Sequence, residues 1–178
     1  MTARELNEYS ALRDTIRQRG TLRIILFLVT VMAWAAATIA TAALAALPVA
    51  TLLPLLLLTA GFEVVFALHT AVERIGRYLQ VFYEEDDPAH PERAWERTAM
   101  AYGRAHPGGP DPLFVAYFVI ATLLNFVPVI LAEPVQIEVT VVGIAHGLAI
   151  ARILVARHTA SGQRTKDLER FQRLKQTH

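Results

Sequence analysis

Four long apolar runs constrain the fold of this 178-residue chain more than any other feature. They cover residues 22–47, 49–72, 112–132 and 135–155, and we place the end of the fourth span at about residue 157. Each run is long enough, at about 1.5 Å of rise per helical residue, to cross a hydrocarbon layer about 30 Å thick. Hydrophobic residues make up 54% of the chain, which is high for a soluble domain of this size. The sequence therefore predicts an all-α membrane protein, a four-transmembrane-helix bundle with amphipathic cytoplasmic helices.

The first run does not resemble a cleaved signal peptide. Its apolar stretch is longer than the usual core of about 7–15 residues, and Glu5, Glu8 and Asp14 precede it. We interpret it as a retained span.

The positive charges give the topology. All 17 Lys and Arg residues lie within 4–23, 74–104 or 152–175, and the two remaining connections contain none. Positively charged residues near spans stay on the cytoplasmic side. We therefore expect a multi-pass protein of the inner cell membrane, with both termini and a loop at 85–111 in the cytoplasm.

Three cytoplasmic elements are expected around the bundle of residues 22–157. Residues 1–21 form an amphipathic helix that begins with a capping box of Thr2 and Glu5 and ends at Gly20. The second span continues as a helix to about residue 84, and the loop contains a short helix from Pro91 to Gly103. The tail, residues 158–178, has apolar residues at helical spacing and is suited to pairing with another helix.

Three polar residues lie deep in the spans at similar levels. By helical rise, Glu63 lies about 21 Å and His146 about 16 Å below the outer ends of their spans, and Asn125 is also near mid-membrane. Two interpretations remain open. The first is a proton or ion relay or polar ligand pocket in which Glu63 titrates. The second is a neutral Glu63 that hydrogen-bonds to Asn125, His146 or a free backbone carbonyl and fixes helix register. Arg152 is an alternative partner for Glu63, or it extends to the headgroups.

A second polar group follows at the inner end of the second span. Its members are His69, Glu73, Arg74, Arg77 and Tyr78. They form three pairs spaced four residues apart, at positions 69 and 73, 73 and 77, and 74 and 78. One interpretation is an interfacial anchor that contacts lipid headgroups. The other is a cytoplasmic mouth that collects cations or an anionic ligand.

Small residues indicate a helix-packing face on the fourth span. Gly143, Gly147 and Ala151 recur every four residues, a spacing that allows close helix contact. This face meets either another helix of the chain or a second copy.

No cofactor, metal or catalytic residue is predicted. The chain has no cysteine, and it contains no Gly-rich phosphate loop, zinc-protease motif or nucleophile elbow. His69 and His146 are expected at different depths, which disfavours a haem held between them within one chain. The formal net charge of +1 gives no indication of nucleic-acid binding.

The leading functional hypothesis is a non-catalytic scaffold or accessory subunit that acts through its cytoplasmic helices and intramembrane packing faces. Its expected partners are the lipid bilayer and either a second copy or a membrane-complex subunit. The alternative is a small oligomeric ion or proton channel or transporter that uses Glu63 and His146. An enzyme ranks third.

Overall fold

The computed structural model describes residues 2–42, 48–83, 95–105 and 110–177. Within these ranges the chain is helical, and four of its helices are long and apolar enough to cross a membrane. The all-helical class and the four long apolar helices are therefore confirmed. The elements, in chain order, are α1 (Ala3–Ala42), a 3₁₀ turn η1 (Pro48–Thr51), α2 (Leu52–Phe82), α3 (Trp95–Ala105), α4 (Pro110–Leu131) and α5 (Gln136–Thr177).

The first helix starts as expected but does not stop where we expected. The Thr2 amide donates to Glu5 Oε2 at 2.6 Å, and the Glu5 amide donates to Thr2 Oγ1 at 3.3 Å, which confirms the capping box. The hydrogen bond from the Thr2 amide lowers the pKa of Glu5. The predicted end at Gly20 is wrong, because α1 continues to Ala42. An interior glycine costs a helix only about 1 kcal/mol, and the apolar helix formers that follow sustain it.

Gly103 is likewise not a helix end. Helix α3 continues past it to Ala105, while Pro91, the predicted first turn, lies outside the described residues, as does most of the predicted loop at 85–111. A glycine commonly ends a helix by adopting the left-handed conformation itself, and Gly103 does not have a positive φ. Among the described residues other than glycine, a positive φ occurs at Glu133, with a value of 48°, in the short turn between α4 and α5.

The chain divides into two compact units. Unit 1 comprises Met1–Arg23, Ala67–Pro110 and Thr159–His178, and unit 2 comprises Ile24–Phe66 and Asp111–His158. Helices α1, α2 and α5 each contribute residues to both units.

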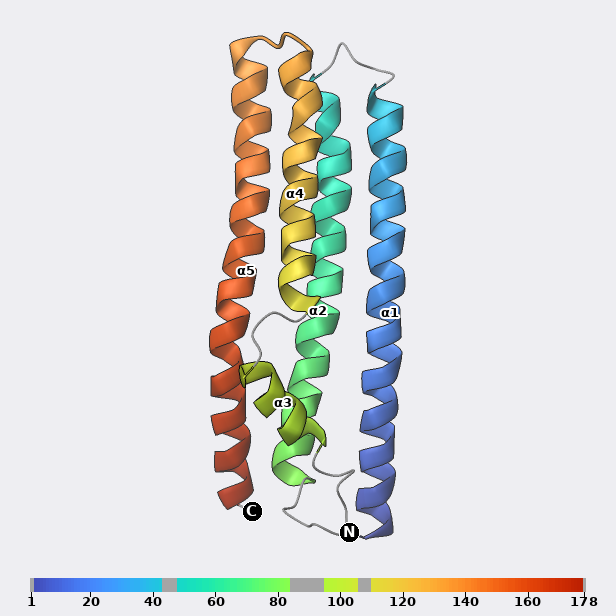
Figure 1. The fold of residues 1–178 in the computed structure, drawn as a ribbon, viewed down its shortest axis with the longest axis vertical. Helices are drawn as coiled ribbons and strands as arrows, with labels where there is room; N and C mark the ends of the chain where they lie inside the picture. The colour runs from blue at the N-terminus through green and yellow to red at the C-terminus, as the bar shows by residue number, and fades with distance from the viewer. Residues whose placement is uncertain (1, 43–47, 84–94, 106–109, 178) are drawn as a thin grey trace. The chain divides into compact units, whose positions relative to one another are not determined.

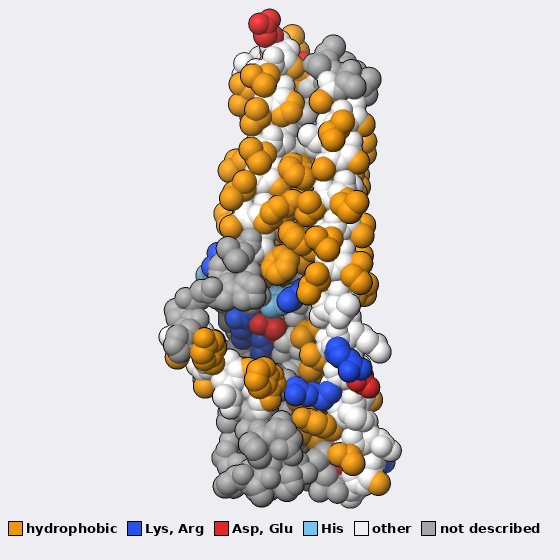
Figure 2. Space-filling model, turned by 45° about the vertical axis from the view of Figure 1, so that its right-hand side comes forward, with side chains coloured by type: hydrophobic (Ala, Val, Ile, Leu, Met, Phe, Trp, Pro, Cys, Tyr) orange, Lys and Arg blue, Asp and Glu red, His pale blue; other side chains and the backbone are white. Residues whose placement is uncertain are grey.

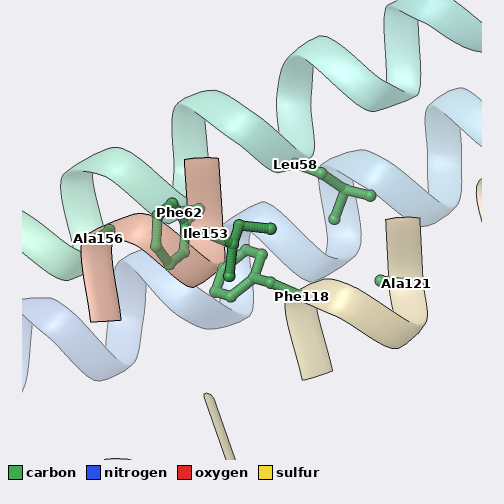
Figure 3. Packing of buried hydrophobic residues seen from close by; sticks show 6 residues of the cluster. All are labelled: Leu58, Phe62, Phe118, Ala121, Ile153 and Ala156. Atoms are coloured by element: carbon green, nitrogen blue, oxygen red, sulfur yellow. The ribbon is translucent and has the colours of Figure 1, made fainter. Parts of the chain in front are cut away.

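Unit 2 is a bundle of four helical segments, from α1, α2, α4 and α5 (Figure 1). Its apolar core joins residues of α2, α4 and α5, and Figure 3 shows the side chains of Phe62, Phe118 and Ile153 directed toward one another. Phe27 of α1 adds edge contacts to the rings of Tyr117 and Phe118, with centroids 5.0 and 6.0 Å apart. Aromatic and aliphatic side chains together thus connect all four segments.

Hydrophobic side chains cover much of the face of unit 2 that Figure 2 shows. Many large apolar side chains are more than half exposed, among them Met32, Leu56, Leu123 and Leu148. This is the surface expected of helices that face an apolar environment rather than water.

Unit 1 is held by aromatic and apolar side chains beside a group of charges. Leu79 is fully buried, and Tyr78 packs against Phe82 and Phe171 with ring centroids 4.7 and 5.7 Å apart. Tyr9 of α1 contacts Tyr83 at 5.7 Å. The tail end of α5 is therefore packed against α2 in unit 1, and Lys175 Nζ also donates to the Val81 carbonyl at 2.6 Å.

Candidate functional site

A buried hydrogen-bond network in unit 2 is centred on Asn125. The Asn125 side-chain amide donates to the Thr51 carbonyl at 2.9 Å and to His146 Nε2 at 3.0 Å. Its carbonyl oxygen accepts from Trp34 Nε1 at 3.3 Å. Asn125 and His146 are 1% and 4% exposed. One side chain of α4 therefore bonds to α1, to the turn before α2 and to α5.

The partners fix the protonation of this network. His146 Nδ1 lies 2.8 Å from the Val142 carbonyl, which only accepts, so Nδ1 carries the ring proton. Nε2 then accepts from the Asn125 amide. The reverse amide orientation would place NH₂ against the Trp34 N–H and oxygen against the Thr51 carbonyl, so it is excluded. Both ring nitrogens of a neutral His146 are occupied, which leaves neither for a metal ion or a mobile proton.

Glu63 belongs to a different site. Its Oε2 accepts from Arg152 Nη2 at 2.7 Å, and Arg152 is its partner among the described residues. The side chains of Glu63 and Arg152 are 44% and 51% exposed. The structure thus pairs Glu63 with the alternative partner and divides the expected mid-span cluster into a buried neutral network and a half-exposed ion pair.

The physical reason for this division is helical rotation. Rise along a helix sets the level of a residue, but each residue also turns by about 100° about the axis. Similar levels therefore do not bring side chains together unless they also share a face. Asn125 and His146 face the interior of unit 2, whereas Glu63 and Arg152 lie at its surface.

Charged residues of α2 and α5 form a second ion-pair group, in unit 1. Arg77 is 5% exposed, and its two Nη atoms lie 3.0 Å from Glu73 and 3.6 Å from Asp167. Arg164 contacts Glu73 with two nitrogens, at 2.6 and 3.0 Å. Arg74, which is 58% exposed, approaches Asp167 at 3.4 Å. These contacts fasten the tail part of α5 to α2.

His69 extends this group toward α1. Arg23 Nη1 donates to His69 Nδ1 at 2.7 Å, because a guanidinium has no acceptor. The proton of a neutral His69 ring is therefore on Nε2, which lies 3.7 Å from Glu73. Tyr78, at the far end of the predicted interfacial group, donates to Glu8 of α1 at 3.0 Å. Burial also raises the pKa of the neighbouring Tyr83.

The interfacial group consequently has two kinds of member. Arg77 is buried and Tyr78 packs against rings of α2 and α5, so these side chains are engaged within unit 1. Arg74 is mostly exposed and lies at the surface of unit 1. The predicted headgroup contacts of the group remain a prediction.

The small-residue face of α5 is largely uncovered. A Cβ added at Gly143 would contact the Phe126 ring at 3.8 Å, but one added at Gly147 would meet nothing within 4 Å. Gly147 and Ala151 are both exposed. A close helix approach occurs instead at Gly61 of α2, where a Cβ would overlap the side chain of Thr30.

Sequence reasoning missed several of these residues. Gly61 had a usable signal, since a glycine inside a helix often has a packing reason. Trp34 had another, since a buried indole N–H needs an acceptor. No sequence signal identified Thr51 or Asp167 as partners.

The described residues include no group of three or more His, Asp or Glu side chains placed to hold a metal ion. Comparison of the chain with protein-family profiles, curated proteins and solved structures finds no significant match.

Proposed function

We propose that this protein is a multi-pass inner-membrane protein, with both termini in the cytoplasm, that acts as a non-catalytic scaffold or accessory subunit. Unit 2 is its membrane-embedded part, and unit 1 presents a cytoplasmic surface to a protein partner. The distribution of Lys and Arg along the chain and the hydrophobic surface of unit 2 support this placement.

The Asn125 network is the observation that carries the proposal. A proton or ion pathway needs a group that gains and loses a proton or a ligand. In this network the hydrogen-bonding groups of Asn125 and both ring nitrogens of His146 are already used. Such a network joins α1, α4, α5 and the turn that precedes α2, and fixes their register, which favours a structural role over transport.

Exposed apolar side chains of unit 1 supply a contact surface. They come from α1, α3 and the tail of α5, with exposed fractions of 55% for Leu6, 60% for Trp95, 65% for Tyr102 and 51% for Leu174. Aromatic residues of this kind often carry much of the binding energy at protein interfaces. They favour a partner protein on the cytoplasmic side.

The placement is tested by labelling single cysteines with an impermeant thiol reagent in intact cells. The native chain has no cysteine, so each substitution reports one position. Ser10→Cys, His90→Cys and Arg170→Cys should stay unlabelled until the cells are permeabilised, whereas Pro48→Cys and Pro134→Cys should label. Labelling of position 90 from outside would overturn the four-span topology.

The function is tested by purification in mild detergent together with flux measurements. We expect a stoichiometric protein partner that Trp95→Ala weakens and that Met32→Ala, at a 72% exposed position of unit 2, leaves bound. Liposomes with the wild-type protein should show no ion or proton flux above empty liposomes. A wild-type flux that Glu63→Gln abolishes without changing the thermal melt would replace the scaffold by the channel alternative.

A further inference from the structure

The Glu63–Arg152 pair is an unusual feature of the surface of unit 2. Glu63 comes from α2 and Arg152 from α5, and about half of each side chain is exposed. Exposed apolar residues lie close by in the sequence, among them Val64 at 47%, Leu148 at 66% and Val155 at 56%. Charges are costly next to hydrocarbon, even when paired, so a bare pair at this position favours a polar partner.

The hydrogen-bonding capacity of the pair is also largely unused. A carboxylate accepts several hydrogen bonds and a guanidinium donates several. Among the described residues, the one hydrogen bond of this pair joins Arg152 Nη2 to Glu63 Oε2. The remaining capacity belongs to side chains that are half exposed, so an external group is able to use it.

A second copy of the chain matches this surface. The pair places an acid on α2 beside a base on α5, so the surface is complementary to itself when rotated by a twofold axis. Arg152 of one copy then meets Glu63 of the other, and both pairs merge into one alternating network. An anionic lipid phosphate would instead attract Arg152 and repel Glu63.

The neighbouring surface of α5 allows the backbones to approach. Ala151 directly precedes Arg152 and Gly147 lies five residues before it, so at about 100° per residue they lie about 100° and 140° around α5 from Arg152. Both are exposed, and a Cβ at Gly147 would meet no atom within 4 Å. Small residues let helices come close in apolar surroundings, where dispersion contacts and hydrogen bonds drive association.

We propose that unit 2 forms a homodimer through the α2–α5 face, in which Glu63 and Arg152 of the two copies pair across a twofold axis. The dimer is independent of the partner proposed for unit 1. If the protein is a monomer that still binds a protein partner, the dimer proposal fails and the scaffold proposal stands. If it is a dimer that binds no partner, the scaffold proposal fails and the dimer proposal stands.

Charge reversal distinguishes pairing between copies from pairing within one copy. Copies carrying Glu63→Arg have two arginines at this site, and copies carrying Arg152→Glu have two glutamates. Each variant alone should lose self-association at least tenfold. Co-expressed with different tags, the two variants should copurify as a mixed dimer, because opposite charges then face each other only between copies. The double variant, Glu63→Arg with Arg152→Glu, should associate like the wild type.

Cysteine cross-linking provides a test that does not depend on the folding of the reversal variants. In the cysteine-free wild-type background, Gly147→Cys, Leu148→Cys and Ala151→Cys should include at least one position that forms a disulfide-linked dimer in native membranes. Met32→Cys, at an exposed position on α1, is the matched control and should not cross-link. Failure of all three α5 positions to cross-link, or mixed reversal variants that do not copurify while both remain folded, would overturn the dimer.

Discussion

In unit 2 the buried polar groups are neutral, whereas in unit 1 they are charged. The Asn125 network uses an amide, an imidazole, an indole and a backbone carbonyl. The group around Arg77 uses guanidinium and carboxylate groups, with Arg77 and Asp167 only 5% and 6% exposed. Both sets join helices that are far apart in sequence.

This difference agrees with the environments proposed for the two units. Neutral hydrogen bonds tolerate hydrocarbon, where an unpaired charge is very costly. Ion pairs suit a region next to water and headgroups, where outer members such as Arg74 and Arg164 are about half exposed. The comparison predicts that removing one charge in unit 1 has a larger effect than removing one neutral group in unit 2.

The largest effect is expected for Arg77→Met, which removes a buried guanidinium between Glu73 and Asp167. Breaking a buried ion pair on one side costs about 3–5 kcal/mol, and we expect about 3 kcal/mol because both carboxylates keep other arginines. Hydrogen exchange of the α2 amides around Leu79 measures it. Arg170→Met is the control: Arg170 is 69% exposed and 3.9 Å from Asp167, and its loss should cost under about 1 kcal/mol. Equal losses of stability in Arg77→Met and Arg170→Met would show that burial of the guanidinium does not set the size of the effect.

The second effect is that of Asn125→Leu on unit 2. This substitution removes three hydrogen bonds and leaves the Trp34 N–H, the Thr51 carbonyl and His146 Nε2 without their partner. With about 0.6 kcal/mol for an average interhelical bond, the loss should be roughly 2 kcal/mol in the free energy of unfolding in micelles. Leu124→Ala, at a 56% exposed neighbour, should change it little. An unchanged melt of Asn125→Leu would show that the network does not hold the bundle.

The third pair of variants, both glycine to alanine, should differ in the direction of their effect on the stability of the monomer. Gly61→Ala forces the new methyl group against Thr30 and should lower the stability of the monomer by about 1–3 kcal/mol. Gly147→Ala meets no neighbour and gains helix propensity, so it should be neutral or stabilising by up to about 1 kcal/mol. Thermal melts in dilute detergent, where copies are separated, compare the two. A destabilised Gly147→Ala monomer would mean that the α5 face is covered within the chain.

The smallest effect concerns the exposed capping box of Thr2 and Glu5. This interaction is local and belongs neither to the Asn125 network nor to the ion pairs around Arg77. The hydrogen bond from the Thr2 amide holds the pKa of Glu5 below its ordinary value of 4.5. A lowered carboxyl pKa stabilises the helix start above the unfolded pKa, and this stabilisation disappears as the pH falls through the folded value. Amide exchange at the first turn of α1 should therefore accelerate in acid. Glu5→Gln should weaken this pH dependence, and an unaltered profile would contradict the assignment.

Much of the helical framework was predictable from local sequence. The second span was expected at 49–72 with an extension to about 84, and η1 and α2 together cover Pro48–Phe82. The third was expected at 112–132, and α4 covers Pro110–Leu131. Long apolar runs and helix caps act over a few residues, so they are visible in the sequence. Gly20 and Gly103 were misjudged because a glycine is compatible with either continuing or ending a helix.

The partners in the candidate sites were less predictable. Glu63, Asn125, His146 and Arg152 were identified as costly residues, since a polar side chain in an apolar run is conspicuous. Their division into two sites could not be deduced, because helical rise gives depth but not the direction in which each helix faces its neighbours. Trp34 lies 91 residues from Asn125, and no local pattern connects them.

The sequence by itself determined that this chain forms four long apolar helices and where its charges and mid-span polar residues lie, because helix formation and hydropathy depend on near neighbours along the chain. The tertiary structure decided that Asn125 bonds to His146, that Glu63 bonds to Arg152, and that Gly61 rather than Gly147 lies against another helix of the chain. These choices depend on how each helix is rotated about its axis, and that rotation results from the packing of all the helices together.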